Sequence, residues 1–172
     1  GSFNSTASQI FNPSTETWTN VGAVTSRYLH TSAQTIDGSV MVISGYNGSG
    51  ISSCQIFNIA TNSWSNITGL YPTRQLASAI CLNSGQILVT GGYDGSSGEH
   101  LSSCLVYNPS LGTWSDFPSF PIPGRKLHTT TRLSDGKILT SNTMNEIKKH
   151  RWERNFYIDK DPSMKSSSYI EK

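Results

Sequence analysis

Short apolar runs recur along the chain, and each follows a turn signal by two residues. The runs occupy 40–43, 87–89 and 138–139, after the glycine of an Asp-Gly or Ser-Gly pair. The run at 40–43 is continuous rather than alternating, as expected for a strand that is buried on both faces. No segment shows sustained helical periodicity, so the pattern predicts an all-β chain of short strands.

A longer phrase recurs between these runs and ends each time in tryptophan. It reads ASQIFNPSTETW over 7–18, SCQIFNIATNSW over 53–64 and SCLVYNPSLGTW over 103–114. The successive tryptophans are 46 and 50 residues apart. Such a period is typical of propeller blades or of large helical repeats. Because the content is strand-like, we predict blades of four short antiparallel strands.

Turn signals delimit the strands within each unit. An Asp-Gly pair such as Asp37-Gly38 is a strong hairpin signal, and we predict a type I′ turn with positive φ at both residues. The equivalent pairs in the next two units are Ser84-Gly85 and Asp135-Gly136. Pro13 and Pro109 each follow an asparagine, and we predict that they end the third strand of their units.

The order of these features resembles the kelch-repeat family. The matching features are the Gly91-Gly92 pair, the Tyr107-Asn108-Pro109 triplet, the closing tryptophans and an arginine before the first strand. Together they cover residues 3–140, most of the chain. The sequence departs from the pattern at Ser44-Gly45, where a small residue still fits, and at Ser141-Asn142, where the repeat stops.

The resemblance implies an all-β fold, a partial kelch-type β-propeller of four-stranded antiparallel blades. Two complete blades, 25–70 and 71–121, are flanked by a blade remnant, 1–24, and a half blade, 122–140. A charged non-repeat tail, 141–172, follows. We expect an incomplete ring whose open strand edges self-associate. The resemblance gives six residues a repeat-structural role: Trp18, Trp64, Trp114, Gly45, Gly91 and Gly92.

Arginines recur at the entry to the first strand, at Arg27, Arg74 and Arg125. The resemblance implies a structural role in which they tie neighbouring blades. The alternative is contact with an acidic partner, because guanidinium groups pair bidentately with carboxylates. Tyr46 and Tyr93 lie in Gly-rich loops between predicted strands and are further candidates for partner contact.

The chain has 13 Lys and Arg and 11 Asp and Glu, so its net charge is too small to attract a polyanion. We therefore predict no nucleic-acid partner, and no apolar run is long enough to span a membrane. Half of the charged residues lie in 141–172, where acidic and basic side chains are interleaved. This pattern is consistent with either a solvated tail or a binding element. Glycosylation sequons at Asn4, Asn47 and Asn66 weakly favour an extracellular location, and the location stays open.

The sequence carries no catalytic, cofactor or metal motif. His30 and His128 recur in the repeat, and we expect them to line the channel of the propeller rather than bind metal. The Gly-rich loops lead into strands rather than a helix, which argues against a phosphate loop. Asp159 and Asp161 begin like a calcium loop that lacks the required glycine. Three cysteines lack metal-ligand spacing and are expected to be small buried strand residues: Cys54, Cys81 and Cys104.

Functions from different classes compete. The first is a non-enzymatic scaffold that recognises a protein, peptide or glycan on its loops, without a cofactor. The second is the propeller part of a larger copper enzyme similar to galactose or glyoxal oxidases, and the third is a purely structural array. The chain offers the residue types of such a copper site but no matching motif, at Tyr28, Tyr46, Tyr93, Cys54 and His30. We predict the scaffold.

Overall fold

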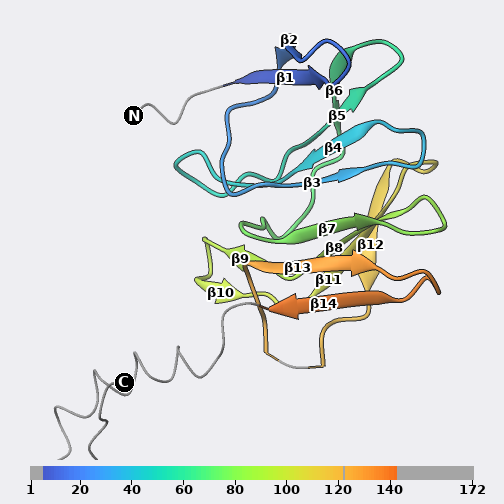
Figure 1. Ribbon diagram of the computed structural model, residues 1–172. Helices are drawn as coiled ribbons and strands as arrows, with labels where there is room; N and C mark the ends of the chain where they lie inside the picture. Colours follow the sequence, from blue (N-terminus) through green and yellow to red (C-terminus); the bar gives the residue numbers. More distant parts are fainter. Residues whose placement is uncertain (1–5, 122, 143–172) are drawn as a thin grey trace, which may run out of the picture. The chain divides into compact units, whose positions relative to one another are not determined.

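The computed structural model describes residues 6–121 and 123–142, and these residues form strands and turns without a helix (Figure 1). The all-β prediction is thereby confirmed. The chain divides into two units, 1–142 and 143–172, and every described strand lies in the first. The described residues include no helix long and apolar enough to cross a membrane. The predicted tail beyond residue 142, with its calcium-like loop, lies outside the described residues.

Two complete four-stranded antiparallel sheets form the centre of the first unit. In each sheet the strands pair in chain order, first to second, second to third and third to fourth. The first sheet contains β3 (Thr31–Gln34), β4 (Val40–Ile43), β5 (Cys54–Asn58) and β6 (Ser63–Ile67). The second contains β7 (Ser78–Cys81), β8 (Ile87–Thr90), β11 (Cys104–Asn108) and β12 (Thr113–Phe117).

Two-stranded sheets stand on either side of these complete sheets in chain order. The first pairs β1 (Ala7–Asn12) with β2 (Thr17–Ala23), which are equivalent to β5 and β6. The last pairs β13 (His128–Arg132) with β14 (Ile138–Asn142), which are equivalent to β3 and β4. This arrangement confirms two complete blades flanked by two half blades, and the described residues form no closed ring. β14 continues two residues past the predicted start of the tail.

The tight turns between the first two strands of each blade differ from the type I′ prediction. The Gly38 N–H donates to Thr35 O and the Thr35 N–H to Ser39 O, which closes a three-residue loop. Gly38 has a φ of 87°, whereas Asp37 is not among the residues with positive φ. The turn is therefore a type I turn followed by a glycine bulge. Asp37 stabilises this turn through its side chain, because the carboxylate accepts hydrogen bonds from Thr35 Oγ1 and the Ser39 N–H.

The turns between the last two strands explain the asparagine in the repeated phrase. The Asn58 side chain accepts hydrogen bonds from the N–H groups of Ala60 and Thr61, at 2.8 and 3.1 Å. Asn108 caps its own turn in the same way. These side-chain bonds replace the ladder bonds that the backbone loses at the turn. β1 ends at Asn12 and β11 ends at Asn108, each directly before a proline, as predicted.

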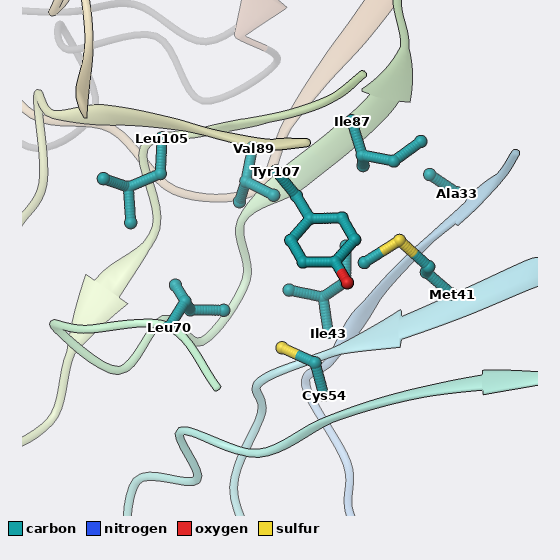
Figure 2. Close-up of a cluster of buried hydrophobic side chains, with 9 residues drawn as sticks. All are labelled: Ala33, Met41, Ile43, Cys54, Leu70, Ile87, Val89, Leu105 and Tyr107. Atoms are coloured by element: carbon teal, nitrogen blue, oxygen red, sulfur yellow. The ribbon is translucent and has the colours of Figure 1, made fainter. Parts of the chain in front are cut away.

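The hydrophobic core lies between the two complete sheets (Figure 2). Alternate residues of β4 and β8 contribute to it. In the run 40–43, predicted to be buried on both faces, Met41, Val42 and Ile43 are buried and Val40 is half-buried, and all four residues of β8 are buried. All three cysteines lie on strands and are free thiols; Cys54 and Cys104 are buried as expected, whereas Cys81 is half-buried. The cluster comprises Ala33, Met41, Ile43, Cys54, Leu70, Ile87, Val89, Leu105 and Tyr107.

The tryptophan of each complete blade packs on the preceding sheet. The Trp114 Nε1–H donates to Thr68 O at 2.9 Å, and Trp64 contacts the site of Gly22 on β2. Trp18 has no preceding sheet among the described residues, and its ring is exposed.

Candidate functional site

A buried arginine holds the Gly-rich loop of the first complete blade at both ends. The Arg27 guanidinium donates to Ser44 O at 3.0 Å and to Ser53 O at 2.6 Å. Ser44 follows β4 and Ser53 precedes β5, so one side chain clamps the two ends of loop 44–53. Gln55 Oε1 accepts a further bond from the same guanidinium.

The second complete blade repeats this clamp with different residues. Arg74 donates to Gly91 O at 2.9 Å, to Ser103 O at 2.8 Å and to Ser103 Oγ at 2.8 Å. Its side chain is fully buried, and desolvation lowers the pKa of Arg74 to about 10. Both guanidinium groups bind inside their own blade, so the implied role of tying neighbouring blades is wrong for these side chains. Arg27 and Arg74 therefore hold the ends of their loops, and their buried side chains are not accessible to a partner.

Arg125 stands at the same repeat position but is partly exposed. The half blade has no third strand among the described residues, so this guanidinium has no equivalent loop to clamp. It lies instead 4.2 Å from the centre of the Phe120 ring, a cation–π contact. Of the three arginines, Arg125 is therefore the one whose side chain is partly accessible.

Tyr46 and Tyr93 occupy equivalent positions at the start of the two loops. Tyr46 exchanges two backbone hydrogen bonds with Tyr28, and Tyr93 exchanges two with Gln75. Both tyrosine rings are half-buried. The Tyr46 ring meets the Tyr28 ring edge-on at 5.3 Å, while Lys126 Nζ lies 4.5 Å from the centre of the Tyr93 ring. Their backbones are fixed, and part of each ring stays accessible.

A leucine follows two residues after each arginine and links consecutive blades, a role that the sequence analysis did not assign. Leu29, Leu76 and Leu127 have φ values of 57°, 55° and 59°, which are uncommon for residues with a side chain. The Leu76 N–H donates to Leu29 O, and the Leu127 N–H donates to Leu76 O, each at 2.9 Å. The recurring Arg-x-Leu sequence could have identified these leucines as conserved parts of the repeat within this chain, although not their contacts.

These features together form one surface, here called the loop rim. It comprises the loops 44–53 and 91–103 and the strand-entry segments 27–30, 74–77 and 125–127. Figure 1 shows loop 44–53 and the small hairpin of β9 (Tyr93–Asp94) and β10 (Glu99–His100) on the left, opposite the tight turns on the right.

Close packing fixes the glycine positions of the rim. A Cβ at Gly91 would lie 2.5 Å from Arg125 O, and one at Gly92 would lie 3.0 Å from Gln75 O. Gly45 is confined in the same way by Tyr28 O.

Ser44, the equivalent of Gly91, takes a different role. Its hydroxyl donates to Ile51 O at 2.6 Å and accepts from the Arg74 N–H at 2.7 Å. The change from glycine thus adds a buried link between blades, which goes beyond the small residue that was expected to fit.

The two recurring histidines have different surroundings. His30 is exposed and precedes β3, whereas His128 is buried at the start of β13. His128 Nε2 lies 2.8 Å from Thr90 Oγ1, and its Nδ1 has no hydrogen-bond partner among the described residues. Burial, aided by the charge of Arg125, lowers the pKa of His128 to about 4. The channel-lining prediction is wrong for His128, which packs between blades.

The described residues contain no group of three or more His, Cys, Asp and Glu side chains placed to hold a metal ion. Cys54, considered for a copper site, lies in the core with its Sγ–H directed at Ser52 O. Asp94, one of the two acids of the second loop, accepts hydrogen bonds from the Ser96 N–H and the Ser97 hydroxyl.

Comparison with known proteins identifies the repeat. The family model for the Kelch motif matches residues 27–70 and 77–121, just over half of the chain. The two matches cover the two complete four-stranded sheets. No curated protein matches the chain.

Proposed function

Because the chain belongs to the kelch-repeat family, we propose that it is a binding scaffold that holds a protein or peptide on its loop rim. Kelch repeats commonly mediate protein interactions, and kelch domains are typically non-enzymatic scaffolds. The rim is the proposed surface because contact residues are concentrated on loops that a rigid frame positions.

The observation that carries this proposal is the buried arginine clamp beneath each loop. Arg27 and Arg74 fix both ends of their loops through carbonyl groups, and the backbone bonds of Tyr46 and Tyr93 fix the first residues. A surface that is ordered before binding loses little conformational entropy when a partner arrives. The clamps thus favour a recognition surface over loose connecting loops.

The exposed chemistry of the rim favours a peptide that carries apolar and acidic side chains. Half-exposed tyrosines and the exposed Leu29 and Leu127 supply apolar contact, and Tyr is common among residues that dominate interfaces. Lys126 adds a positive charge over the Tyr93 ring, and Arg125 adds a second over the Phe120 ring, and either could pair with a carboxylate of the peptide.

The proposal is tested by selecting peptides from a phage-displayed random library on the full chain. The selected peptides are then measured against a Tyr46→Ala, Tyr93→Ala double variant, and we expect binding at least about tenfold weaker. Leu111→Ala is the matched control, because Leu111 is an exposed apolar residue on a turn at the opposite end of the sheet. Peptides that bind the double variant as well as the unaltered chain would exclude the rim as the recognition surface.

A further inference from the structure

An open groove lies between the two complete blades and is distinct from the loop rim. Its lining comes from the segment after β6 and from β11, β12 and the turn between them. None of its lining residues belongs to the loop rim. Its volume is about 470 Å³, within the range of about 300 to 1,000 Å³ that is usual for ligand pockets. The groove is therefore large enough to take a side chain of a partner.

Two hydrogen bonds between the blades fix the walls of the groove. The Trp114 Nε1–H donates to Thr68 O at 2.9 Å, and the Thr68 hydroxyl donates to Gly112 O at 2.7 Å. Both bonds join the segment after β6 to the second complete blade. The walls are thus held in place before a partner arrives, which lowers the entropic cost of binding.

The groove combines aromatic surface with an apolar base. Tyr71 is 85% exposed, and the Trp114 ring is half-buried. The buried Leu105 lines the groove from the core side. A side chain that enters the groove therefore meets two aromatic residues and an aliphatic one.

One carboxylate completes the groove. Asp116 is exposed, and it makes no ion pair with any residue that the structure describes. Its charge acts on Arg74, but that guanidinium is buried and already donates to Gly91 O and to Ser103. The lining contains this one acid and no basic residue, so the groove favours a positively charged occupant.

The repeat provides an internal comparison, at the equivalent place between the β1–β2 sheet and the first complete blade. The tryptophan is kept there, as Trp64. The other three positions differ in chemistry, with Thr25 for Tyr71, Gln55 for Leu105 and Asn66 for Asp116. The tyrosine, the leucine and the acid are therefore not required for one blade to pack on the next.

We infer that the groove binds an arginine side chain of a partner protein. A guanidinium group stacks on aromatic rings and pairs with a carboxylate through two parallel hydrogen bonds. Tyr71 and Trp114 supply the rings, and Asp116 supplies the carboxylate. The methylene stem of arginine packs on apolar surface, which Leu105 provides. This arginine groove is a second contact site and does not rest on the function proposed for the loop rim.

Titration of the isotope-labelled full chain with the peptide acetyl-Gly-Gly-Arg-Gly-Gly-amide tests the inference by nuclear magnetic resonance. The indole N–H signal of Trp114 reports on the groove, and that of Trp64 reports on the equivalent place. We expect the Trp114 signal to shift and the Trp64 signal to stay. A single side chain offers little contact, so the Kd should be on the order of 1 mM. The same peptide with citrulline, the uncharged analogue of arginine, should bind about fivefold more weakly.

Two substitutions replace a groove residue by the residue that the equivalent place carries, so the fold should accept both. Tyr71→Thr removes a ring and should weaken binding of the arginine peptide about fivefold. Asp116→Asn removes the carboxylate and should weaken it about threefold or more.

Other variants serve as controls. Glu16→Gln removes an exposed carboxylate from the turn between β1 and β2, and it should leave binding unchanged. The Tyr46→Ala, Tyr93→Ala double variant should also bind the arginine peptide normally, which separates the arginine groove from the loop rim. An equal loss for Glu16→Gln and Asp116→Asn would show that overall charge, rather than the groove, attracts the peptide.

The remaining outcomes each decide the inference. An unmoved Trp114 signal would overturn it, as would a citrulline peptide that binds as tightly as the arginine peptide. Unchanged affinity in either Tyr71→Thr or Asp116→Asn would also overturn it. A peptide with lysine in place of arginine should bind more weakly, because an ammonium group lacks the planar fork of a guanidinium. Equal binding of the lysine peptide would contradict the assignment to arginine.

Discussion

At the scale of single residues, the buried arginines decide how the rim is held. Arg74→Lys should lower the free energy of unfolding by about 2 to 4 kcal/mol, because lysine cannot reach Gly91 O and both Ser103 acceptors at once. Urea denaturation followed by tryptophan fluorescence measures the loss.

Arg125 supplies the control for that substitution at the same repeat position. Its guanidinium is partly exposed and lies on a ring rather than on buried carbonyls, so Arg125→Lys should change the unfolding free energy by about 0.5 kcal/mol or less. Equal losses for the two variants would show that burial of Arg74 does not stabilise the loop.

His128 makes stability depend on pH. Its pKa is about 4 in the fold against 6.5 for the ordinary value, because burial disfavours the charged form. As pH falls, the unfolded chain takes up the proton first, so this contribution to stability is present above pH 6.5 and is lost between 6.5 and about 4. We expect about 1 to 2 kcal/mol less stability at pH 5 than at pH 7 from this group.

His128→Asn isolates that contribution, because asparagine does not titrate. The variant should lose part of the pH dependence measured by urea denaturation at the two pH values, while the share from the exposed His30 persists. An unchanged difference between pH 7 and pH 5 would assign the pH dependence to other groups.

The sequence predicted which residues recur but not what they contact. The arginine before each first strand was evident from the repeat, yet its burial depends on carbonyl groups brought close by the loop ends. The leucine two residues later was equally visible. Its left-handed backbone and its bonds to the next blade arise only when blades stack.

At the scale of elements, strands were predictable and turn geometry was not. The turn pairs, the apolar runs and the repeated phrase that ends in tryptophan predicted the strands of both complete blades. An Asp-Gly pair fits both a two-residue type I′ turn and a three-residue loop, since glycine has positive φ in either. The bonds of the Asp37 carboxylate to Thr35 and Ser39 belong to the second arrangement.

The loop that follows β8 requires glycine for packing more than for backbone freedom. Gly91 has a φ of 54°, close to the 56° that Ser44 adopts with a side chain. Gly91→Ala should nevertheless cost about 2 to 3 kcal/mol, because its Cβ would lie 2.5 Å from Arg125 O on the next blade.

Gly98 provides the comparison for that substitution. Its φ is 76°, and no atom lies within 4 Å of an added Cβ, so Gly98→Ala carries backbone strain alone, about 1 kcal/mol. Thermal unfolding of the two variants measures the difference. A smaller loss for Gly91→Ala than for Gly98→Ala would contradict close packing between the blades at this point.

At the scale of the molecule, the repeat defined the number of blades and the structure defined their edges. Counting the repeat predicted two complete and two half blades, which the sheets confirm. The pattern alone could not show that the half blades leave Phe11 and Leu139 uncovered, because burial depends on the neighbouring sheet. The predicted partner contact is still a proposal, resting on the rim built by the two complete blades.

Hydrogen exchange of the full chain, with and without a rim-selected peptide at saturation, tests the central claim most directly. The account predicts that slowed exchange is confined to the loops 44–53 and 91–103 and the segments that enter the first strands. Protection centred on the turns 58–63 and 108–113, at the opposite end of the sheets, would contradict the account.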